Sequence, residues 1–248
     1  MPGLHRVQAV VEQGYAFGVI PHMFYDRAAD LVRLIYDGRI DGPPVLDMDA
    51  FFPRGAAFVD AWRSIRDEAN DLTRRLHQVP RFHDIMREQA SISANDGRDW
   101  RMFVLKAYGS EMPKNMAACP ALARLVEESP EVLSASISFL APGKHVPAHR
   151  GPFRGVLRFY LGLSVPLADD GRPAAVLRVA DTEYRIGDGD CMLWDDTFPH
   201  EVWNGSRQVR SVLLLDVWRR DMPIDMVLFS KALIALVRTG IRVRGVAA

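Results

Sequence analysis

The feature that most constrains the fold is a series of short strand-like runs between residues 131 and 220, with no helical run between them. The runs lie near residues 132–139, 155–165, 175–180, 182–186, 190–194, 200–204 and 208–218. Turns between them are marked by Gly171, Gly187, Gly189 and Gly205. Many short strands without intervening helices are typical of an all-β sandwich or a jelly roll. We therefore predict a mainly β fold with flanking helices.

The segments on either side of these strands predict helices. An N-terminal helical segment is expected over residues 1–48, where Ala28 to Tyr36 has helical apolar spacing. The main domain is expected over 49–220, with its barrel core at 132–220. A helical tail follows at 221–248, apolar from Met226 to Val237 and then basic. The tail is predicted to dock on the barrel or in a homodimer contact, or else to lie on a membrane surface.

Charge and cysteine content exclude several classes of protein. The chain has 31 basic and 31 acidic residues, whereas a general nucleic-acid binder usually has a basic excess, so no nucleic-acid partner is expected. Cys119 and Cys191 are too few for a disulfide framework. The Tyr15–Ile20 run is too short for a signal peptide, and no apolar run approaches the ~20 residues that span a bilayer. We expect a cytoplasmic protein, with peripheral membrane contact through the tail as the alternative.

Two histidines are flanked by strand-like runs. His149 follows Pro147 by two residues, and His200 follows Pro199 directly. Imidazole is a common ligand for iron, and the ends of jelly-roll strands can bring two histidines to one ion. We predict that His149 and His200 are metal ligands and act in catalysis.

The third ligand of such a site is an open question in the sequence. Many non-haem iron enzymes place a carboxylate two residues after the first histidine, and here that position is Gly151. Either water fills the third position or a carboxylate comes from elsewhere. Asp195 and Asp196 precede His200, and we expect them to orient His200 or to cap a turn.

Two arginines interrupt apolar strands and point to a bound anion. Alternation places Arg158 on one face with Tyr160, and Arg210 on one face with Leu214. A buried arginine needs an anion or a carboxylate partner, and its planar fork suits a carboxylate such as that of 2-oxoglutarate. The alternative is a solvated strand face or an internal acid. Ser138, at the end of a predicted strand, could donate its hydroxyl to the same ligand.

These residues resemble the aspartyl/asparaginyl β-hydroxylase family, which includes bacterial lipid A hydroxylase-like members. The similarity spans roughly Trp62 to Trp218, and its most specific part is the Asp195–Trp203 stretch. The resemblance implies a cupin-like double-stranded β-helix (jelly roll). It implies ferrous iron held by His149 and His200, with no acid at the third position. It also implies 2-oxoglutarate gripped by Arg210. Further supporting contacts are implied for Ser138, Arg158 and Tyr160, the last replacing a histidine of the animal enzymes.

The sequence therefore predicts an Fe(II)- and 2-oxoglutarate-dependent dioxygenase that uses O2 to hydroxylate an unactivated C–H bond, releasing succinate and CO2. The expected substrate is a small molecule, a peptidyl amino acid or a lipid acyl chain. Two other classes remain open. One is a cupin-like protein that binds a metal or metabolite without turnover, and the other is a metal-dependent isomerase or hydrolase on the same barrel.

Overall fold

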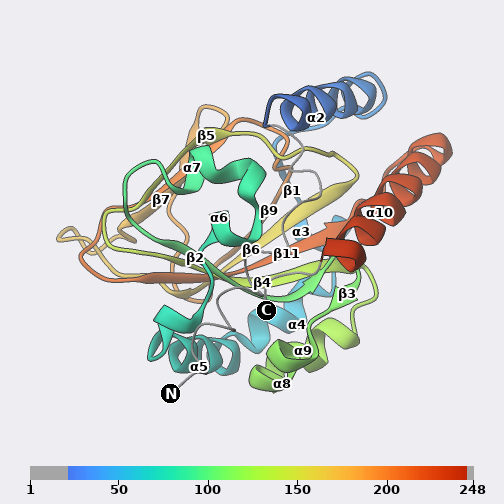
Figure 1. Ribbon diagram of the computed structural model, residues 1–248. Helices are drawn as coiled ribbons and strands as arrows, with labels where there is room; N and C mark the ends of the chain where they lie inside the picture. Colours follow the sequence, from blue (N-terminus) through green and yellow to red (C-terminus); the bar gives the residue numbers. More distant parts are fainter. Residues whose placement is uncertain (1–21, 245–248) are drawn as a thin grey trace, which may run out of the picture.

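The computed structural model describes residues 22–244, with side chains described for 27–241. Its body is a pair of antiparallel sheets (Figure 1). The larger sheet runs in the order β1 (Val45–Leu46), β9 (Cys191–Trp194), β6 (Val156–Ser164), β11 (Arg210–Trp218), β4 (Val132–Leu140), β2 (Trp100–Ala107), β3 (Ser110–Glu111). The smaller sheet runs β5 (His145–His149), β10 (His200–Asn204), β7 (Ala175–Val179), β8 (Thr182–Tyr184).

The strand order is that of a jelly roll. From β4 to β11 the chain passes repeatedly from one sheet to the other, and β7 and β8 are the only consecutive pair that stays in one sheet. The central order β9-β6-β11-β4 faces the order β5-β10-β7-β8. The predicted double-stranded β-helix with flanking helices is confirmed.

The sequence did not predict β5, the strand that ends at His149. Its five residues include Pro147, which cannot donate to a sheet ladder. The strand is tolerated because it lies at the edge of the smaller sheet, where one side needs no partner.

Helices cover the outer face of the larger sheet. The helices of this layer are α3 (Met48–Phe51), α4 (Gly55–Asp60), α5 (Trp62–Thr73), α8 (Pro113–Ala118) and α9 (Pro120–Glu127), with the 3-10 turn η1 (Leu76–Gln78) after α5. Strand alternation sends Phe159 outward, where its ring lies 5.5 Å from that of Phe52 and 6.2 Å from that of Phe58. The same alternation turns Arg158 and Tyr160 inward between the sheets. The main hydrophobic core therefore lies outside the barrel, and the barrel interior is free to hold a site.

A second group of short helices stands beside the barrel interior, namely α6 (Phe82–Ile85), η2 (Arg87–Gln89) and α7 (Ala90–Ser93). The ring of Phe82 stacks on Trp100 at 3.8 Å. Lys144 is fully buried and ties this group to the barrel, because its ammonium donates to the carbonyl of Ser93 and pairs with Asp96 at 2.7 Å.

Two longer helices, α2 (His22–Asp37) and α10 (Ile224–Arg244), pack together on one side of the barrel (Figure 1). The ring of Tyr36 lies 5.6 Å from that of Phe229, and its hydroxyl is 2.5 Å from the Ser230 Oγ. Arg39 pairs with Asp225 at 2.6 Å. Between residues 22 and 244 no helix has the length and apolar character needed to cross a membrane. The Tyr15–Ile20 run and the last four residues of the predicted tail lie outside the described residues.

Candidate active site

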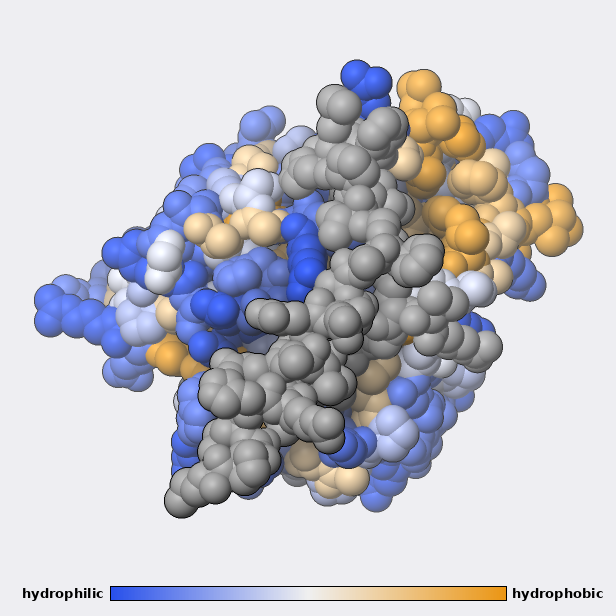
Figure 2. Space-filling view, in the orientation of Figure 1, coloured by the Kyte–Doolittle hydropathy of each residue, from blue (hydrophilic) through white to orange (hydrophobic). Residues whose placement is uncertain are grey.

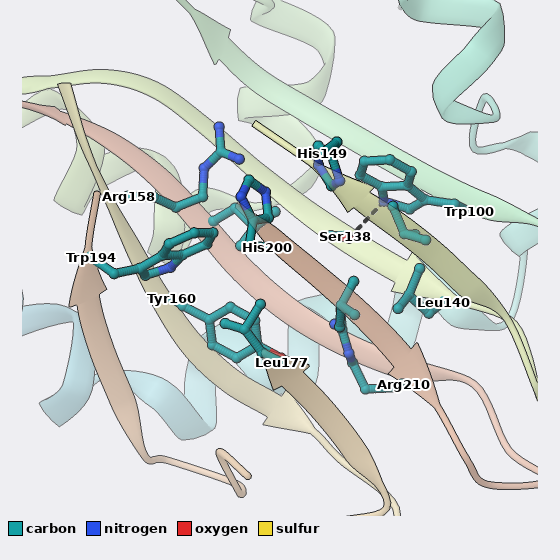
Figure 3. Close-up of a pocket in the computed structure, with 13 residues that line it drawn as sticks. Trp100, Ser138, Leu140, His149, Arg158, Tyr160, Leu177, Trp194, His200 and Arg210 are labelled. Carbon is teal, nitrogen blue, oxygen red and sulfur yellow. Dashed lines mark hydrogen bonds between the residues drawn. The ribbon is translucent and has the colours of Figure 1, made fainter. Parts of the chain in front are cut away.

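All six residues that the sequence singled out line one pocket between the two sheets (Figure 3). They are Ser138, His149, Arg158, Tyr160, His200 and Arg210. The arginines and Tyr160 come from the larger sheet, and the histidines come from the smaller one. The rest of the wall is mostly apolar and includes Leu140, Val146, Leu177, Val202 and Leu214. The pocket therefore has a polar group at each end and a largely apolar lining.

The two histidines face each other across paired strands. His200 in β10 is the register partner of His149 in β5, and their ring centroids are 4.1 Å apart. The Nδ1 of His149 lies 2.8 Å from the Pro147 carbonyl, and the Nδ1 of His200 lies 2.9 Å from the Phe198 carbonyl. A carbonyl only accepts, so each Nδ1 carries the hydrogen and each Nε2 keeps a free lone pair. This backbone-set tautomer is the one that presents Nε2 to a metal.

Burial keeps both imidazoles neutral. Burial lowers the pKa of His149 to about 4. The hydrogen bond to the Pro147 carbonyl acts to raise this pKa, and the nearby Arg158 acts to lower it further. Burial, together with His149, holds the pKa of His200 well below its usual value. A metal ligand must be deprotonated, so the pair meets that requirement at neutral pH.

The space beside Gly151 is filled by a carboxylate from another loop. A Cβ built on Gly151 would collide with Oδ1 of Asp196, so the Asp196 carboxylate occupies the space of a side chain at 151. The Gly151 amide also donates to the Asp196 carbonyl at 2.7 Å. Burial raises the pKa of Asp196 to about 6, against the lowering effect of Arg158. Across residues 22–244, no group of three or more His, Cys, Asp or Glu residues forms a metal cluster.

Asp195 has a structural role beside the site. It is fully buried, and its Oδ2 accepts from Arg154 at 2.7 Å and from Arg219 at 2.8 Å. Its Oδ1 accepts from the amide and the hydroxyl of Thr197. The expectation that this acid caps a turn is met by these contacts. The His200 ring donates to the Phe198 carbonyl, and the backbone of Asp196 is a second hydrogen-bond partner that acts to raise the pKa of His200 against the effect of burial.

Arg210 is a buried cation without an acid beside it. It is 2% exposed, and its Nε has no hydrogen-bond partner. Its guanidinium carbon lies 5.5 Å from the centroid of the Tyr160 ring, and within the described part of the chain it makes no ion pair. Burial lowers its pKa, the opposite of what a paired arginine shows. An uncompensated buried guanidinium is costly, so this end of the pocket is built for an anion.

Arg158, unlike Arg210, is paired with acids. It lies 3.1 Å from Asp196 and 2.9 Å from Asp216, its register partner on β11. Burial alone would lower its pKa, but the two carboxylates outweigh burial and raise it. Of the two alternatives that the sequence left open for Arg158, the internal acid is the one present. Its side chain is 27% exposed and still lines the pocket.

Two tryptophans belong to the site although the sequence did not single them out. Trp100 donates its Nε1 hydrogen to the Ser138 Oγ at 3.0 Å, which leaves the Ser138 hydroxyl hydrogen for a ligand. Trp194 stands edge-on to His200, at 4.6 Å between centroids, and its buried Nε1 has no partner. Both lie in strand-like runs, where an aromatic residue is ordinary. An unpaired buried N–H beside the pocket is a second sign of a missing acceptor.

Comparison with known proteins gives a consistent result. The sequence model of the family described as aspartyl/asparaginyl beta-hydroxylase matches residues 59–220. An ornithine lipid ester-linked acyl 2-hydroxylase from Rhizobium tropici is 36% identical over 188 residues, which is 76% of this chain and 64% of that protein. The human aspartyl/asparaginyl beta-hydroxylase is 30% identical over 129 residues, which is 50% of this chain and 16% of that protein. The chain thus spans less than two thirds of each.

Among solved structures, a cupin domain from Schizosaccharomyces pombe covers 36% of this chain and 57% of its own, with 10% identity and a TM-score of 0.29. A likeness of this size carries no argument. The assignment of the fold rests on the strand order.

Proposed function

The chain belongs to the aspartyl/asparaginyl beta-hydroxylase family, and on that premise we propose that it is an Fe(II)- and 2-oxoglutarate-dependent hydroxylase. One observation carries the proposal. A pair of neutral histidines with free Nε2 atoms and a buried arginine without an acid partner line the same pocket. A divalent metal held by the histidines and a dianion held by the arginine would satisfy both ends together.

The residues present fit these groups. His149 and His200 would hold the iron through Nε2, and the carbonyls of Pro147 and Phe198 keep the rings in that orientation. Arg210 would take the far carboxylate of 2-oxoglutarate in its fork, and this would offset the cost of its burial. The Ser138 hydroxyl, held by Trp100, could donate to the same ligand.

When bound, iron, 2-oxoglutarate and O2 supply the oxidising power to convert a C–H bond into C–OH, with succinate and CO2 as co-products. The chain positions the reactants and excludes water. Leu177 and Val202 of the smaller sheet close the pocket from one side. Asp196 lies against Gly151, two residues after His149, and pairs with Arg158 at 3.1 Å. Its carboxylate would be available to accept a hydrogen bond from a water held by the metal.

For the substrate we propose a lipid acyl chain. The relative that acts on an acyl chain matches 76% of this chain, whereas the human aspartyl/asparaginyl enzyme matches 50%. Apart from the cofactor-binding groups, the lining is apolar, as a hydrocarbon chain requires. A peptidyl aspartate or asparagine would need a further polar partner of its own.

The decisive test is turnover of 2-oxoglutarate by the purified protein with Fe(II) and O2. We expect succinate formation that is stimulated by an acylated lipid, and its loss in His200→Ala. His145→Ala is a matched control, because this histidine lies outside the pocket and pairs with Glu201. Full turnover in His200→Ala would contradict the assignment. Tight binding of metal without turnover would favour a binding protein, and activity that persists without oxygen would favour an isomerase or hydrolase.

A further inference from the structure

Exposed apolar side chains gather on the two long helices. Within the described part of the chain, seven large hydrophobic residues are exposed, and six of them lie on α2 and α10. The six are Leu31, Leu34, Ile35, Ile224, Leu228 and Leu236, from 37% to 81% exposed. We call these six residues the apolar patch. Figure 2 shows orange side chains massed over the region where Figure 1 places both helices.

Helical spacing puts these residues on the outer faces of the helices. Leu31, Leu34 and Ile35 follow the i, i+3, i+4 pattern of one helix face. On α10, Ile224, Leu228 and Leu236 fall on a four-residue spacing. The opposite faces carry the side chains that hold the helices to the protein, such as Tyr36 and Met226. A protein surface with this much contiguous apolar character marks a contact with a partner.

The charge of α10 indicates the kind of partner. The helix begins with one acid, Asp225, which pairs with Arg39 at 2.6 Å, and on α2 the acid Asp30 pairs with Arg33. From Met226 onward the sequence has four basic residues and no acid, namely Lys231, Arg238, Arg242 and Arg244, of which Arg238 donates to the Tyr108 carbonyl. Lys231 is exposed and lies three positions from Leu228. Apolar residues combined with acids that are already paired and an excess of basic charge are suited to a bilayer with anionic headgroups. A second copy of this chain would bring the same positive charge and would repel it.

The patch-bearing helix α2 is fastened to the loop that follows His149. The Arg33 guanidinium donates to the Gly151 carbonyl at 2.9 Å, and Asp37 lies 3.8 Å from Arg150. His149 is only partly buried, whereas His200 is 5% and Arg210 is 2% exposed. The helix α2 therefore connects the apolar patch to the loop beside the most exposed polar group of the histidine end of the pocket.

We propose that the outer faces of α2 and α10 form a docking surface for an anionic lipid bilayer, which the protein binds peripherally. The surface would hold the histidine end of the pocket next to the membrane, so that an acyl chain can enter without crossing water. The proposal that the protein binds the bilayer depends only on the apolar patch and on the charge around it. Only the delivery of substrate rests on the proposed function.

The test is flotation of the full chain with vesicles, without metal or 2-oxoglutarate. We expect binding to vesicles of phosphatidylglycerol and phosphatidylcholine in equal parts, and much weaker binding to phosphatidylcholine alone. Leu34→Asp and Leu228→Asp should each lower the partition coefficient by about tenfold or more, because each removes an exposed leucine that would insert into the bilayer and adds a charge. Lys231→Gln should lower it by about fivefold, since one basic residue near an anionic surface contributes roughly that factor.

Leu167→Asp is the matched control, because Leu167 is 64% exposed, like Leu228 at 63%, but lies between β6 and β7. It should leave vesicle binding unchanged. Equal loss in Leu167→Asp, or no wild-type binding to anionic vesicles, would overturn the proposal. So would a wild-type dimer in analytical ultracentrifugation that Leu228→Asp converts to a monomer. Circular dichroism checks that each variant is folded.

The same preparations separate this proposal from the proposed function. Wild-type protein that binds Fe(II) and 2-oxoglutarate but no vesicles would refute the docking surface alone. Protein that binds vesicles but neither cofactor would refute the hydroxylase alone. Leu34→Asp should bind Fe(II) and 2-oxoglutarate as the wild type does, because Leu34 does not line the pocket.

Discussion

Replacing Arg210 by methionine should stabilise the ligand-free protein while removing its response to 2-oxoglutarate. Arg210 is 2% exposed and its buried Nε has no partner. Leaving a buried polar group unpaired costs about 1–3 kcal/mol, and methionine fills a similar volume without that cost. The free energy of unfolding should therefore rise by about 1–3 kcal/mol. For a chain of this size, each kcal/mol corresponds to roughly 2–4 °C in Tm.

With 2-oxoglutarate present, the wild type should instead be at least as stable as Arg210→Met. At a 2-oxoglutarate concentration about 100 times its Kd, the wild type should gain about 2.7 kcal/mol. Arg210→Met should gain little, because the far carboxylate then has no cation. The assay is thermal unfolding under anaerobic conditions with Fe(II), with and without 2-oxoglutarate. Arg210→Lys keeps the charge but loses the fork, and should show an intermediate response.

Arg158→Met is the contrasting variant. Arg158 pairs with both Asp196 and Asp216, so its loss leaves two carboxylates without their cation. Breaking such a pair destabilises a protein by about 3–5 kcal/mol. The two arginine-to-methionine changes should thus shift Tm in opposite directions. The reasoning is refuted if Arg210→Met destabilises the ligand-free protein as much as Arg158→Met, or if it keeps the full 2-oxoglutarate response.

Three further predictions concern single positions. Gly151→Ala should lower the free energy of unfolding by about 1–3 kcal/mol in urea titrations, because its Cβ would meet the Asp196 carboxylate; a neutral result would mean that Asp196 moves freely. Trp194→Phe should change the stability of the ligand-free protein by less than about 1 kcal/mol, since its Nε1 has no partner to lose, yet isothermal titration should show weaker binding of a pocket ligand; a large stability loss would contradict this. His149 has its folded pKa lowered from 6.5 to about 4 by burial, so the unfolded state takes up a proton first and stability is lost as the pH falls through that window. The pKa of Asp196 is raised from 3.8 to about 6, so this group acts on stability with the opposite sign. Urea unfolding of metal-free His149→Gln should therefore show a smaller loss of stability between pH 6.5 and 4 than the wild type. An unchanged profile would refute the assignment of this pH dependence to His149.

The pocket could be predicted largely from strand alternation. A period of two places Arg158 with Tyr160, and Arg210 with Leu214, whatever the exact strand ends. The structure lines one pocket with all four. Between residues 131 and 220, every strand except β5 was predicted to within about two residues, because the apolar and β-branched runs are bounded by turn residues such as glycine.

What the sequence could not show depends on register and on loops. Asp216 lies opposite Arg158 because β11 pairs with β6 in one particular register, which no local pattern reveals. The approach of Gly151 to Asp196 depends on a hydrogen bond between two loops. Pro147 in β5 argues against a strand at this point of the sequence, because a proline is tolerated mainly in an edge strand. Contacts between distant parts of the chain thus determine which charged side chains are paired.

The most direct test of the account is anaerobic titration of the purified protein with Fe(II) and 2-oxoglutarate, followed by visible absorption. We expect the charge-transfer band of the iron–2-oxoglutarate chelate, lost in His149→Ala and weakened in Arg210→Met. No band in the folded wild-type protein, or a band of full intensity in His149→Ala, would contradict the assignment of this pocket as the iron and 2-oxoglutarate site.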